Sequence, residues 1–206
     1  MIEQLAGVLG RDVPRGTTDL LEHYMALLRY ETGKQNLISS STLDSLWERH
    51  ILDGAQLVKF APAANSSWVD IGSGAGLPGI VIAILVGGPV TLIEPRRLRA
   101  AFLTTTVAEL GLDSRVTVAA KKVERVAGAF DVITARAVAE LDKLLRISTH
   151  LSTRKSLWVL PKGRSAESEL AAARRNWHCD AEIVLSRTDP DSRILLLRNV
   201  KARGGR

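Results

Sequence analysis

The chain has 206 residues, 46% of them hydrophobic, so it can bury a substantial core, and extensive disorder is excluded. Its only cysteine, Cys179, cannot form an internal disulfide or a thiolate metal cluster, so we expect no metal site and a reducing compartment, the cytoplasm. A formal net charge of +6 suits a polyanionic partner such as nucleic acid, although many basic proteins use such a charge only for solubility.

The first part of the chain is predicted to be helical. Residues 17–30 and 41–60 space their apolar side chains three and four positions apart, and each run opens beside Thr or Ser, which favour helix N-termini. No strand pattern interrupts these segments, so we expect a helical extension over residues 1–64. No membrane segment is expected, because the most apolar stretch, near residue 80, is broken by proline and glycine.

From Trp68 onward, short β-rich runs alternate with helical ones. Strand alternating with helix predicts a parallel sheet covered on both faces, an α/β Rossmann-like domain over residues 65–200. The last two β-rich runs follow each other without a helix, so they should form an antiparallel hairpin at one edge of the sheet. The basic tail, residues 201–206, is expected to be disordered. The predicted strands are 68–71, 90–94, 116–120, 131–135, 157–160, 181–186 and 192–200, and the helices between them are 97–111, 140–151 and 166–176.

A glycine-rich loop, DIGSGAGLPG at residues 70–79, joins the first strand to the first helix of this domain. Open α/β sheets bind ligands at this place, where a helix N-terminus offers unpaired N–H groups. The dinucleotide fingerprint G-x-G-x-x-G would require glycine at position 77, which is Leu77, and no Walker sequence follows. The loop looks instead like the first motif of class I S-adenosylmethionine-dependent methyltransferases, with a ligand-free turn as the alternative. Cofactor contacts are expected here from Asp70, Gly72, Ser73, Gly74, Gly76 and Leu77.

Glu94 ends the second strand, about twenty residues beyond the loop, where a carboxylate can accept hydrogen bonds from both ribose hydroxyls of an adenosine. The same carboxylate would serve NAD, and an exposed acid at a strand end is the structural alternative. After the third strand, Val123 offers an apolar face to an adenine, and Glu124 is a weaker candidate for the same site.

Several further motifs occur in a fixed order along the chain: QNLIS (35–39), ERHILDG (48–54), KKVER (121–125), ITARAVAEL (133–141) and LPKG (160–163). Together with the glycine loop they resemble the bacterial small-subunit rRNA guanine-N7 methyltransferase family, also called glucose-inhibited division protein B. The resemblance spans nearly the whole chain. It implies a class I methyltransferase fold, S-adenosylmethionine as methyl donor, and a guanine in the decoding region of 16S rRNA as acceptor, either in free RNA or in a ribonucleoprotein such as the small subunit.

The same resemblance implies cofactor contacts at Gly72, Leu77, Val123, Glu124 and Arg136. The chain departs from the family at two positions. Gly54 stands where family members usually carry Ser, and Lys122 stands where many carry Arg.

The motifs that the chain lacks agree with a ring-nitrogen target. Exocyclic-amine methyltransferases commonly place an Asn/Asp-Pro-Pro-aromatic segment after the fourth strand, where this chain has ITARAVAEL. Methylation at C5 of a pyrimidine requires a cysteine nucleophile, and Cys179 lies outside the expected site. Guanine N7 has a lone pair in the ring plane, so direct displacement there requires alignment and exclusion of water but no base.

Arg136, after the fourth strand, is the expected catalytic residue, since its guanidinium can position a phosphate or a purine edge, with a structural ion pair as the alternative. Four residues of the helical extension form a possible lid or RNA-facing group: Asn36, Arg49, His50 and Asp53. His50 is equally consistent with a packed helix residue. Lys162, after the fifth strand, is a candidate contact to RNA backbone or a solvated lysine.

Two other functional classes stay open at this point. A dinucleotide-dependent oxidoreductase would share the fold and Glu94, and calorimetric titration with S-adenosylmethionine and NAD separates the two. A non-catalytic RNA-binding module would share the basic patches, and only a methyl-transfer assay distinguishes it. We expect the protein to be a monomer.

Overall fold

The computed structural model describes residues 1–39 and 42–204. Its centre is a seven-stranded sheet in the order β3-β2-β1-β4-β5-β7-β6. The first five strands are parallel, and β7 pairs antiparallel with both β5 and β6. This confirms the predicted α/β class and the C-terminal hairpin. The strands are β1 Trp68–Ile71, β2 Val90–Ile93, β3 Val116–Ala119, β4 Val132–Ala135, β5 Leu157–Lys162, β6 Trp177–Leu185 and β7 Arg193–Ala202.

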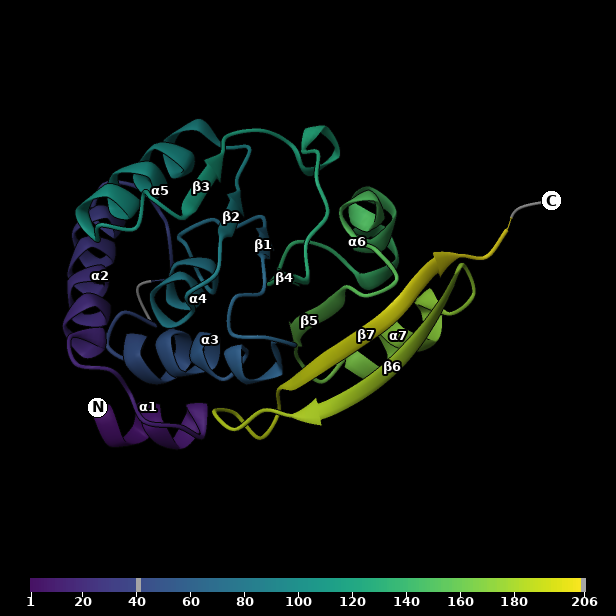
Figure 1. Cartoon of the computed structure of the whole chain (residues 1–206), viewed down its shortest axis with the longest axis horizontal. Helices are drawn as coiled ribbons and strands as arrows, with labels where there is room; N and C mark the ends of the chain where they lie inside the picture. The colour runs from purple at the N-terminus through teal and green to yellow at the C-terminus, as the bar shows by residue number, and fades with distance from the viewer. Residues whose placement is uncertain (40–41, 205–206) are drawn as a thin grey trace.

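The helices lie on both faces of the sheet (Figure 1). One group, α2 to α5, lies on one side, and α6 and α7 lie on the other. No helix in residues 1–39 and 42–204 is long and apolar enough to cross a membrane. The α-helices are α1 Ile2–Leu9, α2 Thr17–Thr32, α3 Asp53–Ala55, α4 Gly79–Leu85, α5 Arg97–Glu109, α6 Leu141–Ser148 and α7 Ala166–Ala173, with shorter helical turns at η2 Trp47–Leu52, η3 Val58–Phe60, η4 Val123–Arg125 and η5 Thr149–Leu151.

Side chains alternate between two apolar cores because successive residues of a strand point to opposite faces. Trp68 belongs to the larger core, and its neighbour Val69 belongs to the other. The larger core also contains Leu5, Tyr24 and Ile51 from the first sixty residues. These helices therefore complete the cover of one sheet face by burying apolar surface against it.

The predicted helix over residues 41–60 is broken into short pieces, and residue 41 lies outside the described part of the chain. From Trp47 to Leu52 the backbone is π-helical, a rare geometry that frequently marks functional sites. Gly54 then lets α3 approach α4 closely: a Cβ built there would lie 3.2 Å from the Cβ atoms of Pro78 and Val81. A serine at this position would require these neighbours to shift.

The last strand continues past residue 200. Lys201 and Ala202 are the final residues of β7, so the segment predicted as a disordered tail begins inside a strand. Residues 205 and 206 lie outside the described part of the chain.

The strand register brings three connecting loops, those after β1, β2 and β4, to adjacent positions at one edge of the sheet. Ile71, the last residue of β1, pairs with Ile93 of β2 on one side and with Ala135 of β4 on the other. Gly72, Glu94 and Arg136 therefore leave the sheet at adjacent positions. The strand order also reverses between β1 and β4, and a reversal of this kind opens a ligand crevice at the carboxyl ends of the strands.

Candidate active site

The loop after β1 depends on its glycines for both conformation and space. Gly72, Gly74 and Gly76 have φ values of +67°, +56° and +93°, in the region that disfavours residues with a Cβ. A Cβ on Gly76 would lie 2.5 Å from Cγ1 of Ile80, and one on Gly72 would lie 2.7 Å from Cγ2 of Val138. The loop is thus tightly curved and closely covered, and no larger residue fits at either position without a shift.

Asp70 and Ser73 support the conformation of this loop from its buried side. The Ser73 hydroxyl donates to the backbone carbonyl of Asp70 at 2.9 Å, and the two residues are only 2% and 1% exposed. The Asp70 carboxylate lies under the start of α4, where a Cβ on Gly79 would come within 2.6 Å of Oδ2. Neither Asp70 oxygen has a hydrogen bond of normal geometry to a described residue.

The pKa of Asp70 is accordingly perturbed. Burial raises it to about 7, against smaller lowering effects from the Ser73 hydroxyl, Arg136 and the Gly79 N–H. Leu77 is likewise buried in the larger core. These placements favour a role in shaping the loop for Asp70, Ser73 and Leu77, rather than direct contact with a ligand.

Glu94 is tied to the glycine loop. Its Oε2 accepts the Gly74 N–H at 2.9 Å and its Oε1 accepts the Arg96 N–H at 2.8 Å, while the residue is 4% exposed. A carboxylate has about four acceptor positions, so two remain for hydroxyl donors. Beyond β3, Val123 is buried and Glu124 is exposed, which fits an apolar role for Val123 better than a polar one for Glu124.

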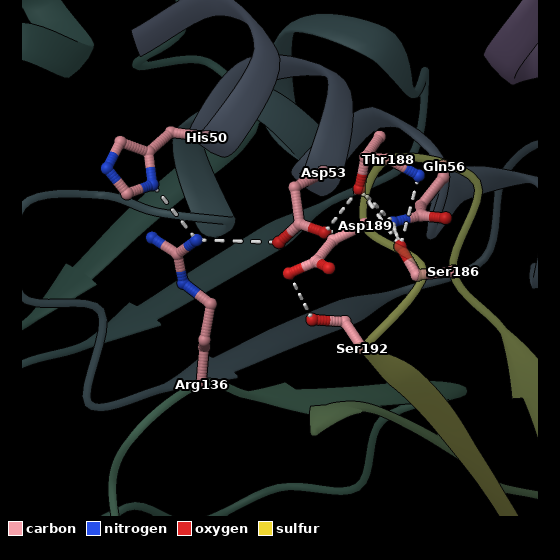
Figure 2. A network of polar contacts seen from close by, with 8 residues as sticks. All are labelled: His50, Asp53, Gln56, Arg136, Ser186, Thr188, Asp189 and Ser192. Carbon is pink, nitrogen blue, oxygen red and sulfur yellow. Dashed lines mark hydrogen bonds and ion pairs between the residues drawn. The ribbon is translucent and has the colours of Figure 1, made fainter. Parts of the chain in front are cut away.

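Arg136 joins the end of β4 to the helical extension (Figure 2). Its Nη1 lies 3.2 Å from Nδ1 of His50 and 3.5 Å from Oδ2 of Asp53. Because a guanidinium only donates, Nδ1 of His50 must accept, and the imidazole proton belongs on Nε2. Burial, followed by the charges of Arg136 and Arg49, lowers the pKa of His50 to about 4, so the imidazole is neutral at physiological pH.

Asp53 is fixed in turn by the loop between β6 and β7. Its Oδ1 accepts hydrogen bonds at 2.9 Å from both the Thr188 hydroxyl and the Gln56 side-chain amide. Gln56, only 1% exposed, also accepts the Arg187 N–H at 2.9 Å. Gln56 and Thr188 were not expected from the sequence. A polar residue within an apolar helical run was a weak signal for Gln56, and nothing local signals Thr188.

A cavity of about 940 Å³ lies beside this network. Arg49, His50 and Asp53 line it from the extension, Arg136 and Val138 from the loop after β4, and Lys162 from the end of β5. Nζ of Lys162 is already paired with Glu169 at 2.7 Å, so contact with an RNA phosphate would compete with that ion pair.

Asn36 lies apart from this cavity. Its backbone carbonyl accepts a hydrogen bond from Arg99 at 3.2 Å, and Arg99 also lies near the glycine loop, 3.7 Å from a Cβ built on Gly74. On the same side, the Tyr24 hydroxyl donates to the Ala75 carbonyl at 2.9 Å. Helix α2 therefore supports the loop directly, a contact that the sequence analysis did not anticipate.

These residues fit an adenosyl cofactor. A glycine cradle at the end of β1, a buried carboxylate at the end of β2 and an apolar residue after β3 match the needs of a backbone-contacted chain, a ribose and an adenine. Val138 links this cradle to the cavity, because it lies against Gly72 and also lines the cavity wall. The cofactor site and the cavity are thus neighbours.

Comparison with known proteins gives a consistent result. A family described as rRNA small subunit methyltransferase G matches residues 17–193. A protein from Rhizorhabdus wittichii named Ribosomal RNA small subunit methyltransferase G is 45% identical over 205 residues, covering 98% of this chain and 94% of that protein. One of the same name from Zymomonas mobilis is 44% identical over 197 residues, covering 91% and 88%.

Solved structures with a similar fold include an S-adenosylmethionine-dependent methyltransferase from Aquifex aeolicus, with a TM-score of 0.59 and 16% identity over 75% of this chain and 92% of that chain. Cofactor-bound Rv0187 from MTB has a TM-score of 0.61 and 19% identity over 88% and 90% of the two chains.

Proposed function

The chain belongs to the rRNA small subunit methyltransferase G family, and we propose that it methylates N7 of a guanine in the decoding region of 16S rRNA. Membership in this family makes the chain an rRNA methyltransferase that uses S-adenosylmethionine, in place of an oxidoreductase or a non-catalytic RNA-binding module.

One observation supports the proposed site above the others. Arg136 follows β4, pairs with Asp53 and His50 of the extension, and lines a cavity that Val138 connects to the glycine loop. An acceptor base in this cavity would lie beside Gly72, which leaves β1 at the position next to Arg136. The geometry therefore favours this cavity as the acceptor pocket.

S-adenosylmethionine, when bound, supplies a methyl group attached to a positively charged sulfur. A guanine N7 has no proton to lose, so the protein needs to align the base and exclude water but not to remove a proton. The ionisable groups agree with this need. His50 is a weak base, with its pKa lowered to about 4, and Asp70, with its pKa raised to about 7, is buried beneath the loop.

Arg136 is proposed to orient the purine through its guanidinium. Its pairing with Asp53 has an electrostatic consequence, since a purine methylated at N7 gains positive charge. An unpaired arginine would oppose that charge, whereas the Arg136–Asp53 pair is nearly neutral and still donates hydrogen bonds. Asp53 thus serves the reaction by compensating charge as well as by holding Arg136.

The cofactor contacts are assigned from the chemistry and burial of the surrounding residues. We assign the ribose to Glu94, the apolar side of the adenine to Val123, and the methionine chain to the backbone around Gly72 and Gly74. Exposed cations near the cavity and beyond β3, namely Arg49, Lys121 and Lys122, are proposed to contact RNA phosphates.

The protein's substrate is a ribosomal RNA of the small subunit. We propose that it is a cytoplasmic monomer and that it acts on 16S rRNA, either free or in a ribonucleoprotein. The free thiol of Cys179 is consistent with a reducing compartment.

The proposed function is tested by mapping methylated nucleotides in small-subunit rRNA from cells with and without the protein. We expect one N7-methylguanosine in the decoding region to be lost when the protein is removed and restored by the wild-type gene. Unchanged methylation at N7, or loss of a methyl group from an exocyclic amine or a pyrimidine, would contradict the assignment.

A further inference from the structure

An enzyme that methylates guanine N7 faces a selection problem, because adenine has the same N7 atom in the same ring. The two purines differ at C6, which carries an acceptor oxygen in guanine and a donor amine in adenine, and they also differ on the edge opposite N7. Guanine presents two adjacent donors there, N1–H and the N2 amine, whereas adenine presents an acceptor at N1. A carboxylate accepts hydrogen bonds and donates none, so an ionised Asp or Glu complements guanine and repels adenine N1. A free carboxylate in the acceptor pocket would therefore select guanine over adenine.

Five carboxylates line the cavity, and three of them are already engaged with cations. Asp53 is paired with Arg136, Glu169 with Lys162, and Asp191 with Arg164. The other two, Glu140 and Asp189, form no ion pair within residues 1–39 and 42–204.

Asp189 and Glu140 differ in how firmly they are held. Glu140 is exposed just before α6, and no side-chain hydrogen bond to a described residue fixes its carboxylate. Asp189 is less exposed, and its carboxylate is fixed by the Asp191 N–H on Oδ1 and the Ser192 hydroxyl on Oδ2, each at 2.9 Å. Two acceptor positions of Asp189 remain for a ligand. A held carboxylate loses less conformational entropy on binding than a free one.

The loop that carries Asp189 is also hydrogen-bonded to Asp53, the partner of Arg136. Its neighbour Thr188 donates to Oδ1 of Asp53, whose Oδ2 faces Arg136 (Figure 2). The position of Asp189 is therefore coupled to that of Arg136 through two short side chains. Such an arrangement suits a planar base that is read on one edge and aligned for chemistry on the other.

The charge of Asp189 further restricts its partner. An unpaired anion repels RNA phosphates, so it is unsuited to phosphate contacts. The Asp191 N–H and the Ser192 hydroxyl keep the pKa of Asp189 below its usual value, so it stays ionised at physiological pH. Among the parts of an RNA, a base edge with several hydrogen-bond donors would bind this ionised carboxylate most strongly.

We propose that Asp189 is the specificity residue of the acceptor pocket and that it accepts hydrogen bonds from N1–H and the N2 amine of the target guanine. This inference rests on the proposed function. It adds a residue that reads the base, in a loop that the family motifs do not include.

The test compares two RNAs that differ only at the mapped target position, one with guanosine and one with inosine. Inosine keeps N1–H, O6 and N7 but lacks the N2 amine. For the wild-type protein we expect the inosine RNA to bind and react about tenfold or more less well, the cost of one hydrogen bond to a charged acceptor. Asp189→Asn should reduce this discrimination to about threefold or less, since the amide has no charge and keeps one acceptor oxygen in place of two.

Glu140→Gln is the matched control, because it neutralises one carboxylate at the same cavity. It should keep the wild-type ratio between the two RNAs. Relaxed discrimination in Glu140→Gln with full discrimination in Asp189→Asn would overturn the assignment. The equilibrium affinity for each RNA is measured as well as the single-turnover rate, so that an effect on RNA binding is distinguished from an effect on methyl transfer.

The wild-type protein alone keeps the inference testable if Asp189→Asn fails to fold. Equal use of guanosine and inosine by the wild type, with N7-methylguanosine formed normally, would overturn the role of Asp189 and leave the proposed function intact. Absence of N7-methylguanosine on the guanosine RNA would instead overturn the proposed function, and the role of Asp189 with it.

Discussion

The guanidinium of Arg136 lies 3.5 Å from Oδ2 of Asp53, although 83 residues separate the two along the chain. Their side chains are about one-fifth exposed, so the pair is shielded from water without being fully buried. Through it the end of β4, the helical extension and the β6–β7 loop form one wall of the cavity.

The first prediction concerns this pair. Arg136→Ala should lower the single-turnover methylation rate by about 100-fold or more, the usual cost of removing a positioned charge-stabilising donor, while RNA affinity falls by about threefold or less. Arg146→Ala, which removes an exposed ion pair with Asp142 on α6, should change neither quantity. Equal losses of rate and RNA affinity in Arg136→Ala would make Arg136 a general phosphate contact.

A second prediction concerns the glycine loop. Gly72→Val should abolish binding of S-adenosylmethionine, because the residue has φ +67° and its Cβ would lie 2.7 Å from Cγ2 of Val138. Gly87→Val is the control, since nothing lies within 4 Å of a Cβ built there. Calorimetric titration of both variants checks the result. A folded Gly72→Val protein with wild-type cofactor affinity would contradict the assignment of this loop.

Glu94 gives a third prediction. Glu94→Gln should weaken S-adenosylmethionine binding by about 1 to 3 kcal/mol through the loss of charge-assisted hydrogen bonds to the ribose. Because the same carboxylate accepts the Gly74 and Arg96 N–H groups, a change in the loop must be separated from loss of the ribose contact. A 2′-deoxy analogue does so: it should lose less affinity with the variant than with the wild type. Equal losses in the two proteins would exclude Glu94 from the ribose site.

The fourth prediction follows from the carboxyl group of Asp70, whose pKa burial raises from 3.8 to about 7. Between these values the folded protein holds a proton that the unfolded chain has lost, so this group makes stability fall as pH rises. Asp70→Asn should therefore gain stability over the wild type between pH 4.5 and 7, by up to about 1.4 kcal/mol per pH unit, and the gain should level off above pH 7.

Denaturant unfolding of both proteins across this range measures the difference. Asp131→Asn is the control, because hydrogen bonds from Ser67 lower the pKa of Asp131 and keep it ionised in the folded state over the range. A constant difference between Asp70→Asn and the wild type would show that Asp70 is ionised in the folded protein.

The local patterns of the sequence predict much of this architecture. The five parallel strands, the C-terminal hairpin and the glycine loop follow from side-chain periodicity and from glycine spacing, which depend on neighbouring residues only. The adjacency of Gly72, Glu94 and Arg136 follows from parallel strands that end at one edge. The structure confirms the strands, the hairpin and the loop. They were predictable because backbone pairing and the burial of apolar side chains follow directly from these local patterns.

The contacts that complete the cavity were not predictable in this way. Gln56 and Thr188 meet only because the extension packs beside a hairpin loop 132 positions away. The π-helical turn that carries His50 likewise replaces a predicted regular helix. Such features depend on tertiary packing, for which a single sequence carries no periodic signal. The ion pair between Lys162 and Glu169 was unpredictable for the same reason, because it depends on how β5 and α7 pack together.

The central claim is that this fold presents a guanine N7 for direct methylation without a base. The most direct test is the single-turnover formation of N7-methylguanosine on small-subunit RNA between about pH 6 and 9, with Asp70→Asn as a control for the buried carboxyl group whose pKa lies near 7. We expect N7-methylguanosine as the product in both proteins, formed at a rate that does not change with pH. A methyl group on an exocyclic amine, or a rate that rises about tenfold per pH unit, would contradict the claim.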